Sequence, residues 1–292
     1  MKPAACLRLM RPHQWVKNGF VLVGLLFGHA WNDPASVRMA LAAFAAFCLL
    51  SSAVYAMNDI LDREEDRRHP AKRLRPLASG AVGVGAAVAL MLACAAAGLG
   101  VAFAWAGDAP WIYLAYLGLN IAYSFGLKHV VIIDVFLIAA GFMLRILAGT
   151  LGLGIEPSHW LLLCSLMLTL FLGFSKRHAE LRALAGAGAA AEHRPVLEHY
   201  THELLDKMIT VAAAGTLVSY SLYTVAEETV ALHGTTELIY GVPFVLYGMF
   251  RYLFLLHRRG GGGDPAQELL RDPHLMAALA GWLAVTLWLL RG

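Results

Sequence analysis

Charged side chains are scarce in this chain. Only 15% of its 292 residues are Asp, Glu, Lys or Arg, whereas soluble domains carry about a quarter. Hydrophobic residues make up 59% of the chain, and the mean hydropathy is +0.62. Such a composition excludes an ordinary soluble domain, because too little polar surface is present to face water. We therefore expect one integral membrane domain that covers residues 1–292.

Signs of nucleic-acid binding and of a metal cluster are also missing. The net charge is only +3, and aromatic and basic residues do not alternate, so we expect no nucleic-acid partner. The four cysteines are widely spaced and form no CxxC pair, which argues against a disulfide framework. His13, His69 and His178 do not fall at metal-ligand spacing, and we interpret them as loop residues.

Long apolar stretches fill most of the chain. A bilayer core is crossed by about 20 apolar residues in a helix. On that basis the sequence predicts nine membrane-spanning helices, at 16–31, 37–57, 82–106, 109–125, 131–152, 158–175, 208–226, 238–256 and 274–290. Segments 183–191 and 260–263 are rich in Ala and Gly and are interpreted as flexible linkers.

Most of the 23 lysines and arginines fall on one side of these predicted spans. They occupy the N-terminus and every second loop, and basic loops stay in the cytoplasm. The N-terminus and the polar face should therefore be cytoplasmic, in the inner or plasma membrane.

The strongest motif is NDILDREED at 58–66. If the second predicted helix continues past Met57, then Asp59, Asp62 and Asp66 share one face. Clustered carboxylates repel one another unless a cation lies between them, and oxygen ligands of this kind suit Mg²⁺. Asn58 could orient a ligand. The alternative is a solvated acidic helix end paired with neighbouring arginines.

Three cations follow this motif, in the proline-flanked segment PAKRLRP at 70–76. Lys72, Arg73 and Arg75 would join the carboxylates and a metal in a clamp for a leaving diphosphate. The alternative is that they only mark the cytoplasmic side.

Further candidates lie near or inside predicted spans. Tyr123, Lys128, Asp134 and Arg145 form one set, and ionisable groups within a span tend to face a cavity. The alternatives are an interfacial aromatic for Tyr123 and a structural pair with a buried acid for Arg145.

Two basic segments complete the candidates. Lys176, Arg177 and Glu180 lie in SKRHAEL, where Lys176 and Glu180 could instead form a surface ion pair. Lys17 lies in RPHQWVKN, where it could instead anchor the first helix at the interface.

The NDxxDxxxD motif, the RPLASG segment at 75–80 and the nine-helix layout resemble the UbiA-type intramembrane prenyltransferase superfamily. The resemblance implies an all-α fold with helices around a central cavity and a cytoplasmic polar cap, where acidic motifs hold Mg²⁺ and a diphosphate. Members that transfer a prenyl group carry a second DxxxD between helices 6 and 7. This chain has KRHAEL there, at 176–181.

The strings RPHQWVKN, NDILDREEDRRHPAKRLRPLASG, YSFGLKH and GFSKRHAEL resemble the decaprenyl-phosphate phosphoribosyltransferase branch. This branch implies phosphoribosyl diphosphate (PRPP) as donor and a polyprenyl phosphate in the membrane as acceptor, in the supply of an arabinose precursor for the cell wall. The basic residues at 176–177 suit a donor with additional phosphate charge.

The resemblance also implies roles for the candidates. Asp59, Asp62 and Asp66 would hold Mg²⁺, and Lys17, Lys72 and Arg75 would stabilise the leaving diphosphate. The ribose 5-phosphate and the lipid phosphate would be held by Lys128, Arg145, Lys176 and Arg177, and the ribose hydroxyls would be bound by Asp134 and Glu180. The rival functions are a conventional prenyltransferase with an aromatic acceptor and a lipid-binding or transport protein. Helices rich in Ala and Gly would also permit a homo-oligomer.

Overall fold

A computed structural model describes residues 3–68, 72–187, 195–259, 268–269 and 271–291. Within these ranges the chain forms helices and no strands. In chain order they are α1 (Pro3–Met10), η1 (Pro12–Leu22, a 3₁₀ helix), α2 (Val23–Phe27), α3 (Pro34–Leu61), α4 (Arg63–Arg68), η2 (Lys72–Leu74), α5 (Val84–Trp105), α6 (Trp111–Ser124), η3 (Leu127–His129), α7 (Ile133–Thr150), η4 (Leu151–Leu153), α8 (His159–Ala187), η6 (Pro195–His199), α9 (His202–Val225), α10 (Glu227–His233), η7 (Glu237–Gly241), α11 (Val242–Arg259) and α13 (Pro273–Leu289).

Six segments of this part of the chain are helical, long and apolar enough to cross a membrane. They are Pro34–Leu61, Val84–Trp105, Ile133–Leu153, His159–Ala183, His202–Val225 and Glu237–Arg258. The other three predicted spans coincide with shorter elements. Residues 16–31 include the end of η1 and all of α2, residues 109–125 contain the 14-residue α6, and residues 274–290 overlap the 17-residue α13.

Helix α8 is longer than the sequence suggested. It continues to Ala187, so the first part of the predicted linker at 183–191 is helical, as a run rich in alanine favours. His178 also lies in α8 and His13 in η1 rather than in loops, which corrects the interpretation of both. The rest of that linker, the predicted linker at 260–263 and His69 lie outside the described residues.

The chain divides into two compact units that do not follow chain order. Unit 1 consists of Met1–Gly126 and Leu144–Glu156, and unit 2 consists of Leu127–Met143 and Pro157–Gly292. Helix α7 therefore starts in unit 2 and ends in unit 1.

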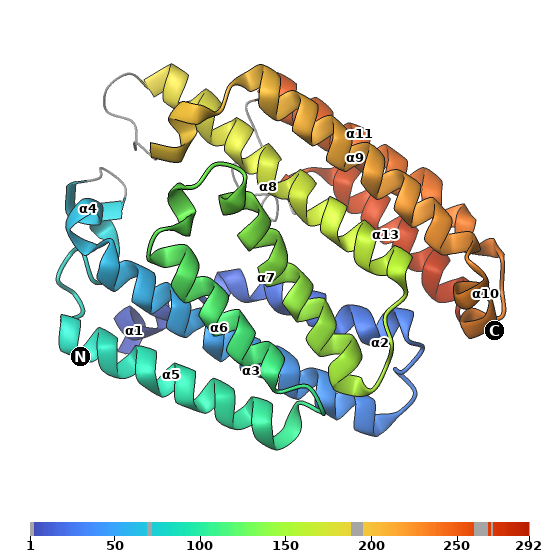
Figure 1. Cartoon of the computed structure of the whole chain (residues 1–292), viewed down its shortest axis with the longest axis horizontal. Coiled ribbons are helices and arrows are strands. Elements are labelled where there is room, and N and C mark those ends of the chain that lie inside the picture. The colour runs from blue at the N-terminus through green and yellow to red at the C-terminus, as the bar shows by residue number, and fades with distance from the viewer. Residues whose placement is uncertain (1–2, 69–71, 188–194, 260–267, 270, 292) are drawn as a thin grey trace. The chain divides into compact units, whose positions relative to one another are not determined.

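In unit 1 the long helix α3 lies beside α5 (Figure 1). Asp33 begins α3, because its carboxylate accepts hydrogen bonds from the first-turn backbone, including the Ser36 N–H at 2.9 Å. The two helices approach closely at Gly98, where a Cβ would lie only 2.8 Å from the Leu50 side chain. Phe47 and Leu50 are fully buried in the core of this unit.

Glycines also bring backbones together where η1 and α2 meet the end of α7 in unit 1. A Cβ on Gly149 would overlap the Val21 carbonyl, and a Cβ on Gly24 would overlap the Gly149 carbonyl. A larger residue at either position would push these segments apart.

In unit 2, α8 packs beside α9, and α11 packs beside α13 (Figure 1). Phe171 of α8 meets Tyr252 of α11 edge to face, with ring centroids 5.3 Å apart. Asp272 begins α13 by accepting the Leu275 N–H at 3.0 Å, and it pairs with Arg251 at 2.8 Å. The hydrogen bonds from Arg251 lower the pKa of the Asp272 carboxyl to about 2.

Candidate functional site

The acidic motif spans the junction of α3 and α4 in unit 1. Helix α3 continues past Met57 to Leu61, as predicted, and then ends at Asp62. The Asp62 carbonyl accepts the Asp66 N–H at 2.8 Å, so the interruption is one residue long and α4 resumes at once. Asp62 therefore stands between two helices, and the three carboxylates do not lie on one continuous helix.

Two of the three motif carboxylates converge on one cation. The Asp59 and Asp66 side chains are each only 2% exposed. One guanidinium nitrogen of Arg75, Nη1, lies 3.4 Å from Asp59 Oδ1 and 2.7 Å from Asp66 Oδ2. Arg11 donates a second charged hydrogen bond to Asp59. Buried charges require such partners, because desolvation of an unpaired carboxylate is costly.

A tight loop presents Arg75 to the carboxylates. The Ser79 N–H donates to the Arg75 carbonyl at 2.9 Å, and Gly80 turns the chain with a φ of +78°. Arg67 of α4 donates to the Ala78 carbonyl at 3.3 Å, which attaches this loop to the helix that carries Asp66. Contacts within one short segment of the chain therefore position both the Asp66 carboxylate and the Arg75 guanidinium.

Arg11 is a site residue that the sequence interpretation missed. It has a left-handed backbone with a φ of +52° and directly precedes Pro12, which keeps the preceding residue out of the α region. Its guanidinium carbon lies 5.0 Å from the centroid of the Tyr55 ring. Its position beside Pro12, in the same basic string RPHQWVKN that contains the predicted candidate Lys17, could have indicated it.

An open cleft of about 550 Å³ lies over these residues in unit 1. Its ionisable lining residues are Arg8, Arg11, His13, Asp59 and Arg75. Three arginines against one carboxylate give the cleft a positive balance, which suits an anionic ligand.

Asp59 and Asp66 also fit a divalent metal. Carboxylate oxygens are the ligands that Mg²⁺ prefers, and an oxygen from each residue already reaches a single cationic nitrogen. Asp62 is half-buried at the junction of the two helices, within the same motif. Arg75 now contacts both carboxylates, so it would compete with a metal for them.

Asn58 is oriented from α6. Its Oδ1 accepts a hydrogen bond from Ser124 Oγ at 2.6 Å, and Ser124 is a buried residue that the sequence interpretation also missed. Tyr123, the predicted candidate, is the half-buried residue beside it.

Arg145 is 7% exposed in unit 1 and contacts an asparagine, a tyrosine and a phenylalanine. It donates to Asn18 Oδ1 at 2.8 Å and to the Tyr116 hydroxyl at 3.0 Å. Its guanidinium carbon also lies 5.3 Å from the Phe47 ring centroid. These contacts favour a packing role for Arg145, in which it ties η1 to α6. Lys17 is the half-buried neighbour of Asn18 in η1.

A second polar group lies in unit 2. Arg177 of α8 donates to Asp134 Oδ2 at 2.7 Å and to Glu180 Oε2 at 2.5 Å. Asp134 is fully buried and Arg177 is 1% exposed. The two predicted ribose ligands, Asp134 and Glu180, therefore both contact the predicted phosphate ligand Arg177.

Tyr200 completes this group and was not predicted. Its hydroxyl donates to Asp134 Oδ1 at 2.9 Å and accepts the Ile132 N–H at 2.7 Å. Ile132 has a φ of +69°, a strained value for a β-branched residue. Burial raises the pKa of the Tyr200 phenol, so the proton needed for the bond to Asp134 is retained.

The remaining candidates lie on short elements or at a helix surface. Lys72 is half-buried and Arg73 exposed in η2, Lys128 is half-buried in η3, and Lys176 is half-buried in α8.

Comparisons with known proteins agree on one family. The model of the UbiA prenyltransferase family matches residues 19–267. A decaprenyl-phosphate phosphoribosyltransferase from Corynebacterium glutamicum is 36% identical over 95% of this chain and 84% of its own length. One from Mycobacterium tuberculosis is 33% identical over 96% of this chain and 92% of its own length.

Solved structures show the same fold. A UbiA homolog from Archaeoglobus fulgidus bound to DMAPP and Mg²⁺ superposes with a TM-score of 0.73, at 19% identity, over 98% of this chain and 99% of its own. With six helices of membrane-spanning length among its described residues, the chain is a multi-pass membrane protein. The chain belongs to the UbiA prenyltransferase family.

Proposed function

We propose that this protein transfers 5-phosphoribosyl from PRPP to a polyprenyl phosphate of decaprenyl type and releases diphosphate, with Mg²⁺ as cofactor. The observation that carries the proposal is the similarity, over nearly the whole chain, to relatives named decaprenyl-phosphate phosphoribosyltransferase. The product is a lipid-linked precursor for the cell envelope.

The cleft in unit 1 suits the departure of diphosphate. As the bond between C1 of the ribose and the diphosphate oxygen lengthens, negative charge grows on the leaving group. Arg11 and Arg75 line the cleft and stabilise that charge, with Arg8 beside them. Asp59, Asp62 and Asp66 would hold a Mg²⁺ ion, which would supply further positive charge to stabilise the leaving group. Asn58, positioned by Ser124, orients a ligand beside them.

The acceptor does not require a strong base. A phosphate monoester is already ionised at neutral pH, so its oxygen attacks C1 as the diphosphate leaves. Lys17 and Lys72 assist the leaving group. The remaining phosphates and the ribose hydroxyls are bound by residues among Arg73, Tyr123, Lys128, Asp134, Lys176, Arg177 and Glu180.

We further propose nine membrane crossings, with the N-terminus and the site on the cytoplasmic side of the cell membrane. The first predicted span contains only a short α-helix, α2, which cannot cross a bilayer by itself. It is preceded by the 3₁₀ helix η1, and a 3₁₀ helix rises about 2.0 Å per residue rather than the 1.5 Å of an α-helix. At these rises η1 and α2 together reach about 30 Å, which is the thickness of a bilayer core. A homo-oligomer is compatible with the small residues on these helices.

One assay tests the proposed reaction. Detergent-purified protein is incubated with Mg²⁺, PRPP labelled in the ribose and a polyprenyl phosphate, and the label is followed into the organic phase. We expect one diphosphate released per labelled lipid, and no transfer in EDTA. If the label stays in water, and a parallel incubation with a prenyl diphosphate and a phenol yields a prenylated phenol, the protein is a conventional prenyltransferase.

A further inference from the structure

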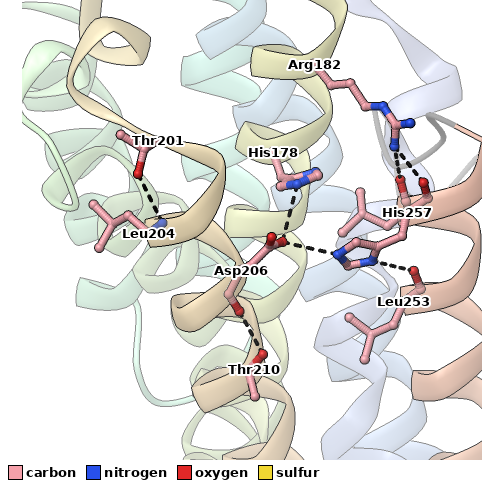
Figure 2. Close-up of polar contacts among 9 residues, drawn as sticks. His178, Arg182, Thr201, Leu204, Asp206, Thr210, Leu253 and His257 are labelled. Atoms are coloured by element: carbon pink, nitrogen blue, oxygen red, sulfur yellow. Dashed lines mark hydrogen bonds and ion pairs between the residues drawn. The ribbon is translucent and has the colours of Figure 1, made fainter.

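Two histidines and an aspartate converge in unit 2, on three different helices. They are His178 of α8, Asp206 of α9 and His257 of α11 (Figure 2). Nε2 of His178 lies 3.3 Å from Asp206 Oδ1, and Nε2 of His257 lies 3.2 Å from the same oxygen. One ligand atom from each residue lies within 4.8 Å of the other two.

The His257 ring is oriented as a metal ligand would be. Its Nδ1 lies 2.9 Å from the Leu253 carbonyl oxygen, which can only accept a hydrogen bond (Figure 2). Nδ1 therefore carries the proton, and Nε2 of the neutral ring presents a lone pair to the Asp206 carboxylate. Two lone pairs at 3.2 Å repel each other unless a proton or a metal ion lies between them.

The His178 ring can present a lone pair as well. The residue is 4% exposed, and its Nδ1 has no hydrogen-bond partner among the residues that the structure describes. With the ring proton on Nδ1, the hydrogen bond from Nε2 to Asp206 is lost, and a metal ion bound between Nε2 and the carboxylate would replace it. Nε2 then faces Asp206 Oδ1 with its lone pair available for a ligand.

The two separations from the Asp206 oxygen match zinc coordination. Bonds of about 2.0–2.1 Å in a tetrahedron place neighbouring ligand atoms about 3.3 Å apart. The two measured separations from Asp206 Oδ1 are 3.2 and 3.3 Å. Two imidazoles and one carboxylate suit Zn²⁺ and are a poor set for Mg²⁺, which prefers oxygen.

We propose that His178, Asp206 and His257 bind one Zn²⁺ ion, with water at the fourth position. The side chains of Asp206 and His257 are 43% and 50% exposed, so an ion can enter from water. The ion would join α8 to the start of α9 and the end of α11. It would also fix the turn of α8 that carries Arg177, the residue before His178.

The test measures binding of Zn²⁺ alone. Tag-free full-length protein in detergent is stripped with EDTA, desalted and dialysed against Zn²⁺ in the presence of millimolar Mg²⁺. We expect one Zn²⁺ per chain, and Co²⁺ in its place should give the intense visible absorption of a tetrahedral site. Asp206→Asn and His257→Gln alter exposed side chains and should weaken binding by about tenfold or more.

His129→Gln is the matched control, because His129 is an exposed histidine of the same unit. It should bind Zn²⁺ as the unaltered protein does. The proposal is overturned if the unaltered protein binds no Zn²⁺ at micromolar concentrations. It is equally overturned if Asp206→Asn and His257→Gln bind Zn²⁺ as tightly as His129→Gln, and Asp206 is then simply a hydrogen-bond partner of two protonated histidines.

Discussion

Replacing Asp66 with asparagine tests the site most directly. The carboxylate is 2% exposed and accepts a hydrogen bond of 2.7 Å from Arg75. Asparagine keeps the size and one oxygen but removes the charge that holds Arg75 and would hold Mg²⁺. Loss of one preorganised electrostatic group in an active site costs about 2.7–4 kcal/mol, or roughly 10²–10³ in rate. We therefore expect kcat for phosphoribosyl transfer to fall by that factor.

Glu65→Gln is the control for this change. Glu65 precedes Asp66 in α4 and is exposed, so the substitution removes the same charge one residue away. A surface change of this kind is worth at most about 0.5 kcal/mol, or roughly twofold. Any larger effect at Asp66 therefore comes from its position rather than from the net charge of the segment.

The assay is the initial rate of label transfer into lipid, measured over a range of Mg²⁺ concentrations. Melting temperatures in detergent establish that both variants are folded. Added Mg²⁺ should recover part of the lost rate in Asp66→Asn, because a weakened site fills at higher concentration. Equal rates for Asp66→Asn and Glu65→Gln at every Mg²⁺ concentration would refute the assignment of Asp66.

Three further changes test other parts of the structure. Lys176→Ala should raise the KM for PRPP or for the lipid phosphate at unchanged melting temperature, and unchanged kinetics would indicate a surface ion pair instead. Tyr200→Phe should lower the free energy of unfolding by about 1–3 kcal/mol, because buried Asp134 and the Ile132 N–H each lose a hydrogen-bond partner. Tyr240 is exposed, so Tyr240→Phe is the control and should leave the melting temperature unchanged. Equal melting temperatures for the two variants would contradict the reasoning. Because the pKa of Asp272 is lowered in the folded protein, its carboxylate contributes stability above pH about 4, and this contribution is lost as the pH falls towards about 2. The melting temperature of Asp272→Asn should therefore vary less over that pH range than that of the unaltered protein.

The half of the site that lies in one stretch of sequence could be predicted. Asp59, Asp66 and Arg75 fall within 17 consecutive residues, and helical spacing with a short loop is enough to bring them together. The interruption at Asp62 could not be predicted, because one non-helical residue between two helices leaves the spacing of the motif almost unchanged.

Contacts between distant segments escaped the sequence interpretation for a different reason. Arg11 meets Asp59 across 48 positions, and Tyr200 meets Asp134 across 66. Neither pair has a local pattern that could reveal it, since the partners meet only when the helices pack. The histidines show the same limit, because spacing along one segment says nothing about ligands on three helices.

The position of Arg75 between two carboxylates has a consequence for the order in which ligands bind. In the absence of ligands this arginine neutralises Asp59 and Asp66, so a metal ion must displace it and loses affinity as a result. A diphosphate in the cleft offers Arg75 an alternative counter-ion and thereby releases the carboxylates. On the proposed function, metal and donor therefore bind with positive cooperativity, and by thermodynamic reciprocity each raises the affinity of the other by the same factor.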